Sequence, residues 1–192
     1  YEKPYGHERE KVESETGERK SCLINITSSY REMEKRAKEV ANYGNEYVMI
    51  DIVTVRFSAL HSIRDVCDDL RLAIHAHRAM HASFTRNRKH GISMFVLAKL
   101  ARIVGVDQIH IGTAGAGKLE GEKKDVIEYA RILREKHYKP DSNDPFHLEQ
   151  NMYHIKPVMP VSSGGLHPGN LPLVIEALGK DLVLQIGGGV LG

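Results

Sequence analysis

Short apolar runs without polar alternation recur along the chain, and amphipathic stretches separate them. Runs of this kind are typical of parallel strands that are buried on both faces of a sheet. A further, weaker strand is predicted within Phe146–Asn151. The six main runs are Cys22–Ile26, Tyr47–Ile52, Leu72–His75, Gln108–Ile111, Pro157–Val161 and Leu182–Ile186.

Apolar residues at three- and four-residue spacing predict five helices between these strands. Gly44, Gly105 and Gly179 follow three of the stripes and are expected to end those helices. Ser58 is a candidate N-cap of the second helix. The stripes run from Tyr30 to Ala41, Leu60 to Leu70, Ile92 to Ile103, Val126 to Leu133 and Leu171 to Leu178.

Several strand starts lie about 25 residues apart, which is the repeat length of a βα unit. Such units close into a barrel or form a doubly wound open sheet. The chain lacks the opening glycine fingerprint of a nucleotide-binding sheet, so the predicted fold is α/β, an incomplete TIM (β/α)₈ barrel. We expect strands 2 to 8 within residues 1–192, with residues 1–20 as the end of a preceding helix and a loop, and the first strand missing.

The composition narrows the possible partners and the compartment. Lys and Arg total 27 against 25 Asp and Glu, a net charge of +2, which argues against a dedicated nucleic-acid binder. No apolar run approaches the roughly 18 residues of a membrane span. Two cysteines cannot form a disulfide framework, so a cytoplasmic protein is expected. The ends at Tyr1 and Gly192 suggest part of a longer chain.

Polar residues fall repeatedly where the predicted strands end. In a barrel of parallel strands, that edge is the face on which active sites are built. The residues concerned are Asn25 and Thr27, Asp51, His77 and Arg78, His110, Ser162 to Gly165, and Gly187 to Gly189.

The densest of these clusters is the segment His75–His81. His75 and His77 share one face of a strand, where imidazole can transfer protons or bind a metal. Arg78 offers a fork of donors suited to phosphate. Structural histidines in a large core are an equally open interpretation, whereas zinc is disfavoured because nothing completes a ligand set.

The segment Gly112–Leu119 matches G-x-x-x-x-G-K, but Leu119 replaces the Ser or Thr that should bind magnesium. A nucleotide-binding P-loop is therefore disfavoured. The pattern favours a flexible loop that carries Lys118 and closes over the site. A simple mobile connection with a solvated Lys118 is the alternative.

Glycine-rich turns follow the last two predicted strands, at Ser162–Gly165 and Gly187–Gly189. Glycine lets backbone N–H groups approach an anion closely, and barrels often bind phosphate at these two loops. Tight turns alone could also demand glycine. Together with Arg78 and His110, the turns suggest a bisphosphate substrate.

These residues lie within stretches that resemble the large subunit of ribulose-1,5-bisphosphate carboxylase/oxygenase. The AGAGKLEG and SGGLHPG forms look most similar to the archaeal-type, form III, enzymes. The stretches occur in the family's order and are HAHRAMHA (75–82), HGISMFVLAKL (90–100), IHIGTAGAGKLEGE (109–122), PVSSGGLHPG (160–169) and LQIGGGVLG (184–192).

The resemblance implies a role for each matching residue. His77 would move protons at the substrate carbon, and Lys118 would stabilise the incoming carboxylate. Arg78 and His110 would hold one phosphate, with Ser163 near the substrate hydroxyls. The implied reaction carboxylates ribulose 1,5-bisphosphate with CO₂ to two 3-phosphoglycerates, with an oxygenase side reaction, in nucleotide-ribose salvage. Gly165, Gly187 and Gly188 would bind the other phosphate through their backbone N–H groups, and Gly164, which precedes Gly165 in the turn, would also contact the substrate.

The resemblance also implies parts that this chain lacks. The family binds Mg²⁺ through a carbamylated lysine and two acids, and no matching motif occurs here, so no metal ligand is predicted. The N-terminal domain that completes a neighbouring subunit's active site in a homodimer or larger homo-oligomer is also lacking. We therefore expect a fragment that is inactive alone. The alternatives are a carboxylase-like enolase or isomerase acting on a phosphorylated sugar, and a non-catalytic barrel module.

Overall fold

The computed structural model describes residues 4–87, 89–117 and 122–191. The chain divides into two compact units, residues 1–79 and residues 80–192. Parallel strands joined by helices build both units, so the α/β class predicted from the sequence is confirmed.

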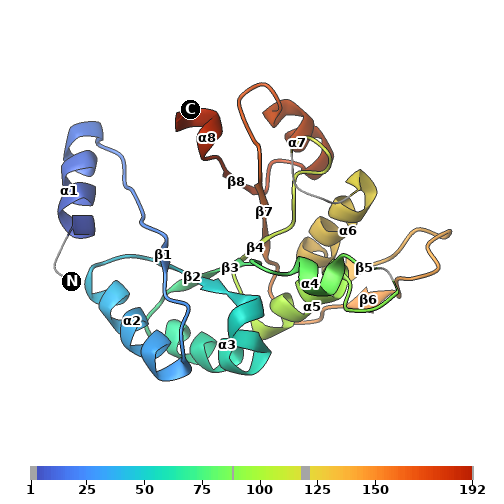
Figure 1. The fold of residues 1–192 in the computed structure, drawn as a ribbon, viewed down its shortest axis with the longest axis horizontal. Coiled ribbons are helices and arrows are strands. Elements are labelled where there is room, and N and C mark those ends of the chain that lie inside the picture. The colour runs from blue at the N-terminus through green and yellow to red at the C-terminus, as the bar shows by residue number, and fades with distance from the viewer. Residues whose placement is uncertain (1–3, 88, 118–121, 192) are drawn as a thin grey trace. The chain divides into compact units, whose positions relative to one another are not determined.

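The first unit contains three parallel strands connected by helices. Strand β2 pairs with β1 on one side and β3 on the other, with Val48 opposite Ile24 and Asp51 opposite His77. Helices α2 and α3 lie next to each other beside these strands (Figure 1). The elements are α1 (Pro4–Thr16), β1 (Ile24–Asn25), α2 (Tyr30–Asn42), β2 (Tyr47–Asp51), α3 (Ile52–Asp69) and β3 (Ala73–His77).

The predicted apolar positions form the core of this unit. Val48, Ile50 and Ile74 of the strands are fully buried. The stripe of α2 and the stripe of α3 supply further buried side chains, namely Met33, Ala37, Leu60, Ile63 and Cys67. Burial of these side chains provides the main stabilisation of the helices against the strands.

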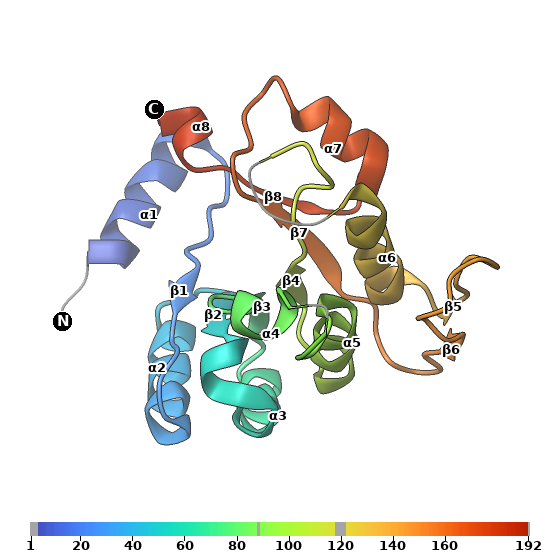
Figure 2. The same cartoon turned by 45° about the vertical axis from the view of Figure 1, so that its right-hand side comes forward.

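The second unit also has three parallel strands, with β7 between β4 and β8. Helix α6 contacts both α5 and α7 (Figure 2). Its elements are α4 (Ala82–Thr85), α5 (Met94–Val104), β4 (Gln108–His110), α6 (Lys123–Arg134), β5 (His137–Tyr138), β6 (Gln150–Asn151), β7 (Met159–Ser163), α7 (Leu171–Leu178), β8 (Val183–Gln185) and α8 (Gly188–Leu191).

The predicted helix ends are confirmed where glycine terminates a stripe. Gly105 adopts φ 98° after α5 and Gly179 adopts φ 77° after α7. Helix α3 differs from the prediction because it begins at Ile52 rather than near Ser58. Arg56, at φ 65° and ψ 169°, interrupts the helix, and only the part after this kink carries the predicted stripe.

The extra strand predicted within Phe146–Asn151 is corrected by the structure. Only Gln150–Asn151 is a strand, and it pairs antiparallel with β5 in a separate two-stranded sheet. Phe146 and Leu148 remain largely exposed, so their apolar character does not reflect burial in a parallel sheet. The described ranges therefore supply six parallel strands, and the predicted count of strands 2 to 8 is not confirmed.

Arg102 on α5 joins three segments of the second unit from within its core. Its side chain is almost fully buried and donates hydrogen bonds to the carbonyl oxygens of Ile132 and Glu135 at 2.6 and 2.8 Å. It also donates to the carbonyl oxygens of Ile155 and Lys156 at 3.3 and 3.0 Å. Burial lowers the pKa of Arg102 from its ordinary value, and the four carbonyls compensate for its lost hydration.

Replacing Arg102 with methionine is expected to lower the free energy of unfolding by about 4 kcal/mol, because buried carbonyls left unpaired cost about 1–3 kcal/mol each. Urea unfolding of the protein measures this loss. Lys38→Met is the control, since Lys38 forms only an exposed ion pair with Glu34 and should cost under about 1 kcal/mol. A loss of unfolding free energy in the Arg102 variant as small as that in the control would contradict the role of Arg102 in joining these segments of the core.

Candidate active site

Four polar side chains meet at the carboxyl ends of the three strands in the first unit. Asp51 at the end of β2 lies opposite His77 at the end of β3, and His77 Nδ1 is 2.5 Å from Asp51 Oδ1. Asn25 Nδ2 donates to Asp51 Oδ2 at 3.0 Å. The Thr27 hydroxyl accepts a hydrogen bond from the Asp51 amide at 2.8 Å. Three segments thus position one carboxylate beside one imidazole.

The hydrogen bonds to Asp51 keep its carboxyl group ionised. Partial burial would raise the pKa of Asp51, but hydrogen bonds from Asn25, His77 and Thr27 outweigh burial and lower the pKa below its usual 3.8. An ionised carboxylate only accepts hydrogen bonds. His77 Nδ1 therefore carries a hydrogen toward Asp51, and Nε2 is the ring nitrogen suited to exchanging a proton with a substrate.

Arg78 follows directly after β3, and its side chain is 7% exposed. His75, two residues before His77 on the same strand, is buried as well. A buried guanidinium is a strong donor for anions because it stays charged and holds its N–H groups in a fixed plane. The structure therefore places two of the predicted site residues at the carboxyl end of one strand, because His77 is the last residue of β3 and Arg78 follows it.

A second pair of predicted site residues meets in the second unit. His110 ends β4 and Ser163 ends β7, which are neighbouring parallel strands. His110 Nδ1 lies 2.7 Å from Ser163 Oγ, and both side chains are buried. This hydrogen bond fixes the direction of the hydroxyl group and of the imidazole ring at the carboxyl edge of the strands.

The two predicted glycine turns differ in what the backbone requires. Gly164 and Gly165 adopt φ 104° and 72°, a left-handed conformation that favours glycine whatever the function. Gly187 and Gly188 lie outside that region, and a Cβ built on either meets no atom within 4 Å. The turn explains glycine at 164 and 165, whereas the local fold does not demand it at 187 and 188.

The turns nevertheless lie at the same edge of the second unit. Ser163, at the end of β7, pairs with Gln185 of β8, and Gly187 follows two residues later. Backbone N–H groups after neighbouring parallel strands converge at their carboxyl ends, where an anion can accept their hydrogen bonds. Lys118, the predicted closing-loop residue, lies outside the described residues.

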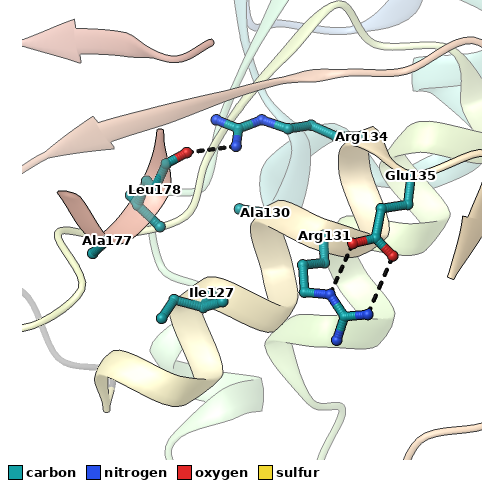
Figure 3. A pocket seen from close by; sticks show the side chains of 7 residues that line it. All are labelled: Ile127, Ala130, Arg131, Arg134, Glu135, Ala177 and Leu178. Carbon is teal, nitrogen blue, oxygen red and sulfur yellow. Dashed lines mark hydrogen bonds and ion pairs between the residues drawn. The ribbon is translucent and has the colours of Figure 1, made fainter. Parts of the chain in front are cut away.

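A hollow between α6 and α7 contains none of the predicted site residues (Figure 3). It measures about 140 Å³ and is lined mainly by apolar atoms, including those of Ala130 and Leu178. Its arginines serve the helices around it, because Arg131 pairs with Glu135 and Arg134 donates to the Leu178 carbonyl at 2.5 Å. We interpret it as a packing groove.

Within the described part of the chain, no three His, Cys, Asp or Glu side chains lie close enough together to hold a metal ion. None of the helices in that part is both long and apolar enough to cross a lipid bilayer.

The sequence matches the family model of the ribulose bisphosphate carboxylase large chain, catalytic domain, over residues 7–192. The chain belongs to this family. It is 67% identical over 183 residues to the ribulose bisphosphate carboxylase of Archaeoglobus fulgidus, covering 95% of this chain and 42% of the relative. The chain therefore spans less than half the length of that family member.

Solved structures agree with the family assignment. A crystal structure of an archaeal Rubisco superposes with a TM-score of 0.90 at 59% identity, over 97% of this chain and 43% of the other. A structure described as a dimeric archaeal Rubisco from Hyperthermus butylicus gives 0.91 at 53% identity, over 97% and 43%. The resemblance found in the sequence motifs is confirmed.

Sequence reasoning assigned no role to Asp51, although the structure makes it the partner of His77. The available signal was its position at a strand end, together with Asn25 and Thr27 at the end of the preceding strand. The sequence motifs gave no role to Asn170 either. Its side-chain amide donates hydrogen bonds to two backbone carbonyl oxygens from separate loops.

Proposed function

We propose that this chain supplies part of the catalytic domain of a ribulose bisphosphate carboxylase. The enzyme would add CO₂ to ribulose 1,5-bisphosphate and yield two 3-phosphoglycerates, with oxygenation as a side reaction. The family match over residues 7–192 carries this proposal. The hydrogen-bonded pairs Asp51–His77 and His110–Ser163, at the carboxyl ends of parallel strands, support it.

His77 is proposed to move a proton at the reacting carbon of the substrate. Asp51 holds its Nδ1 at 2.5 Å, so proton exchange uses Nε2. General acid–base catalysis of this kind contributes about 10²–10⁴ in rate. Lys118 is proposed to stabilise the new carboxylate through its positive charge, as the resemblance implies.

Arg78 and His110 are proposed to bind one phosphate of the substrate, and Ser163 to contact its hydroxyl groups. Arg78 can donate through two parallel N–H groups, a geometry that phosphate accepts well. The hydrogen bond between His110 and Ser163 orients both side chains before substrate arrives. Such preorganisation reduces the entropy that substrate binding would otherwise cost.

The other phosphate is proposed to bind at backbone N–H groups of Gly165, Gly187 and Gly188, next to Gly164. Support comes from the last two glycines, which neither the backbone conformation nor steric crowding requires. Glycine at these positions gives an anion access to the backbone that a Cβ would obstruct.

Replacing Gly188 with alanine is expected to raise the KM for ribulose 1,5-bisphosphate about 10-fold, the effect of losing roughly one good hydrogen bond to a charged group. The melting temperature should change little, because the added Cβ meets open space. Gly189→Ala is the contrasting variant. Its Cβ would lie 2.1 Å from the Leu166 carbonyl oxygen, so it should lower the melting temperature. An unchanged KM in Gly188→Ala would contradict phosphate binding there.

The family implies a Mg²⁺ cofactor, but the described residues do not fit a magnesium site by themselves. Mg²⁺ needs several oxygen ligands in near-octahedral geometry, and no suitable cluster of acidic side chains occurs among these residues. A carbamylated lysine outside this chain is therefore proposed to hold the metal.

We further propose the architecture and setting of the longer protein to which this chain would contribute. Its catalytic domain would be a (β/α)₈ barrel, of which this chain forms an incomplete part. The Hyperthermus butylicus relative is described as dimeric, which supports a homodimer or a larger homo-oligomer. A cytoplasmic location is proposed because two cysteines cannot form a disulfide framework, and a role in nucleotide-ribose salvage is proposed because the resemblance to the archaeal-type enzymes implies it.

The test is carboxylation by the longer protein that contains this chain. With Mg²⁺, bicarbonate and ribulose 1,5-bisphosphate, ¹⁴C from CO₂ should appear in 3-phosphoglycerate. Exchange of a substrate proton with solvent without labelled 3-phosphoglycerate would indicate an enolase or isomerase instead. Absence of both reactions, together with no binding of the bisphosphate, would indicate a non-catalytic module.

A further inference from the structure

Asn170 occupies the N-cap of α7, yet its side chain does not cap that helix. Asparagine is among the best N-cap residues because its side-chain oxygen accepts an N–H from the first turn. Here the side chain is directed to other segments, and the residue is only 7% exposed. Local helix stability therefore does not account for this amide.

Three hydrogen bonds engage the Asn170 side chain. Its Nδ2 donates to the carbonyl oxygen of Ala116 at 2.9 Å and to that of Gly165 at 3.0 Å. Its Oδ1 accepts the amide N–H of His167 at 2.9 Å. A neutral amide is required for this arrangement, because both donors of one nitrogen serve carbonyls from different loops.

The two loops that Asn170 joins also contact each other directly. The hydroxyl of the buried Thr113 accepts the amide of Gly117 at 3.0 Å, which folds the loop after β4 into a tight turn. A Cβ added to Gly117 would lie 2.2 Å from the Gly164 carbonyl oxygen. The loop and the glycine turn thus approach more closely than any side chain permits.

We propose that Asn170 is a positioning residue that holds the turn of Ser163, Gly164 and Gly165 against the loop formed by residues 113–117. The role rests on the proposed function, because that turn is the proposed binding segment for a substrate phosphate and hydroxyls. Asn170 itself contacts backbone carbonyls, and it acts on the substrate through the direction of the Gly165 peptide.

Loss of these bonds would let the turn shift relative to β7. The displaced turn would then no longer meet the substrate phosphate and hydroxyls in the geometry that their binding requires. The Ser163 hydroxyl remains bonded to His110, so the change should fall mainly on substrate binding rather than on proton transfer at His77.

Asn170→Asp is the sharpest variant, because it keeps the shape and the acceptor for the His167 amide but removes both donors. In the longer protein we expect the KM for ribulose 1,5-bisphosphate to rise about 10-fold, with kcat changing less than threefold, since a substrate-binding contact is lost. Asn170→Gly is the second variant, because it removes all three side-chain hydrogen bonds without adding a charge, and glycine is well tolerated at an N-cap.

Asn151→Asp is the matched control. Asn151 Oδ1 accepts only the Tyr153 amide at 2.9 Å in an exposed turn, a bond that aspartate also makes. The KM of the Asn151→Asp variant should equal that of the wild type. An unchanged KM in either folded Asn170 variant would overturn the proposal. A fall in kcat without a change in KM would also overturn it, because a merely structural role would produce that result.

Amide hydrogen exchange separates this proposal from the proposed function. The amides of Ala116 and Gly117 are hydrogen-bonded in the loop after β4, so both Asn170 variants should exchange them at least about 10-fold faster while exchange in α2 and α3 stays unchanged. The His167 amide, which bonds Asn170 Oδ1, should exchange faster only in Asn170→Gly. If the wild type does not carboxylate, the proposed function fails, but the exchange result still decides whether Asn170 holds the loops. Uniform or unchanged exchange would overturn it.

Discussion

In the longer protein that contains this chain, replacing Asp51 with asparagine is expected to lower kcat for the proposed carboxylation about 1,000-fold, the middle of the range for general acid–base catalysis. Asp51 holds the Nδ1–H of His77 at 2.5 Å. An asparagine amide can donate to Nδ1 instead, which favours the opposite tautomer and places the hydrogen on Nε2. His77 could then no longer accept a proton through the nitrogen proposed to serve the substrate.

The chain contains a matched control for this substitution. Asp144 lies 2.7 Å from His147 Nδ1, so Asp144→Asn alters a similar aspartate–histidine pair outside the proposed site. That variant should keep the kcat of the wild type. ¹⁵N spectra of the imidazole groups should show the His77 hydrogen on Nδ1 in the wild type and on Nε2 in Asp51→Asn. A normal kcat in Asp51→Asn would contradict the role assigned to this carboxylate.

In the longer protein, replacing Lys118 with alanine is expected to reduce the proposed carboxylation by about 1,000-fold while sparing much of the bisphosphate binding. A positive charge placed where a carboxylate forms stabilises the transition state more than the bound substrate, and loss of one such group costs about 10²–10³ in kcat. Equilibrium binding of ribulose 1,5-bisphosphate, measured beside ¹⁴C incorporation, separates the two effects.

Lys123→Ala is the control, because Lys123 begins α6 as an exposed residue of the same charge. It should carboxylate at the wild-type rate. Unchanged carboxylation in Lys118→Ala would refute the role given to this lysine. Equal losses in binding and in turnover would instead indicate that Lys118 mainly binds substrate.

Much of the fold could be predicted because its signals are local. The stripe of Met33, Ala37 and Val40 became the buried face of α2, and Gly105 ended α5. The weaker strand predicted within Phe146–Asn151 is present only at Gln150–Asn151, and it pairs in a separate antiparallel sheet. A short run does not show whether it will be covered, and most of this one stayed exposed beside an antiparallel pair.

The candidate site could be predicted only in part, because contiguous motifs reveal single residues but not the contacts between residues that are distant in the sequence. His77, Arg78, His110, Lys118 and Ser163 lie in contiguous motifs, so the family resemblance could imply a role for each of them. Their partners lie far away in sequence. Asp51 is 26 residues from His77, and Ser163 is 53 residues from His110.

By itself, the sequence determined the α/β class, the order of most helices and strands, the family, and the residue types available for chemistry. Periodicity and contiguous motifs carry that information because they depend on neighbours in the chain. Only the tertiary structure decided that Asp51 orients His77, that Asn170 joins two loops, and that Gly188, unlike Gly164, is not required by the backbone. Those facts depend on strand register and backbone conformation, which arise when distant segments pack together.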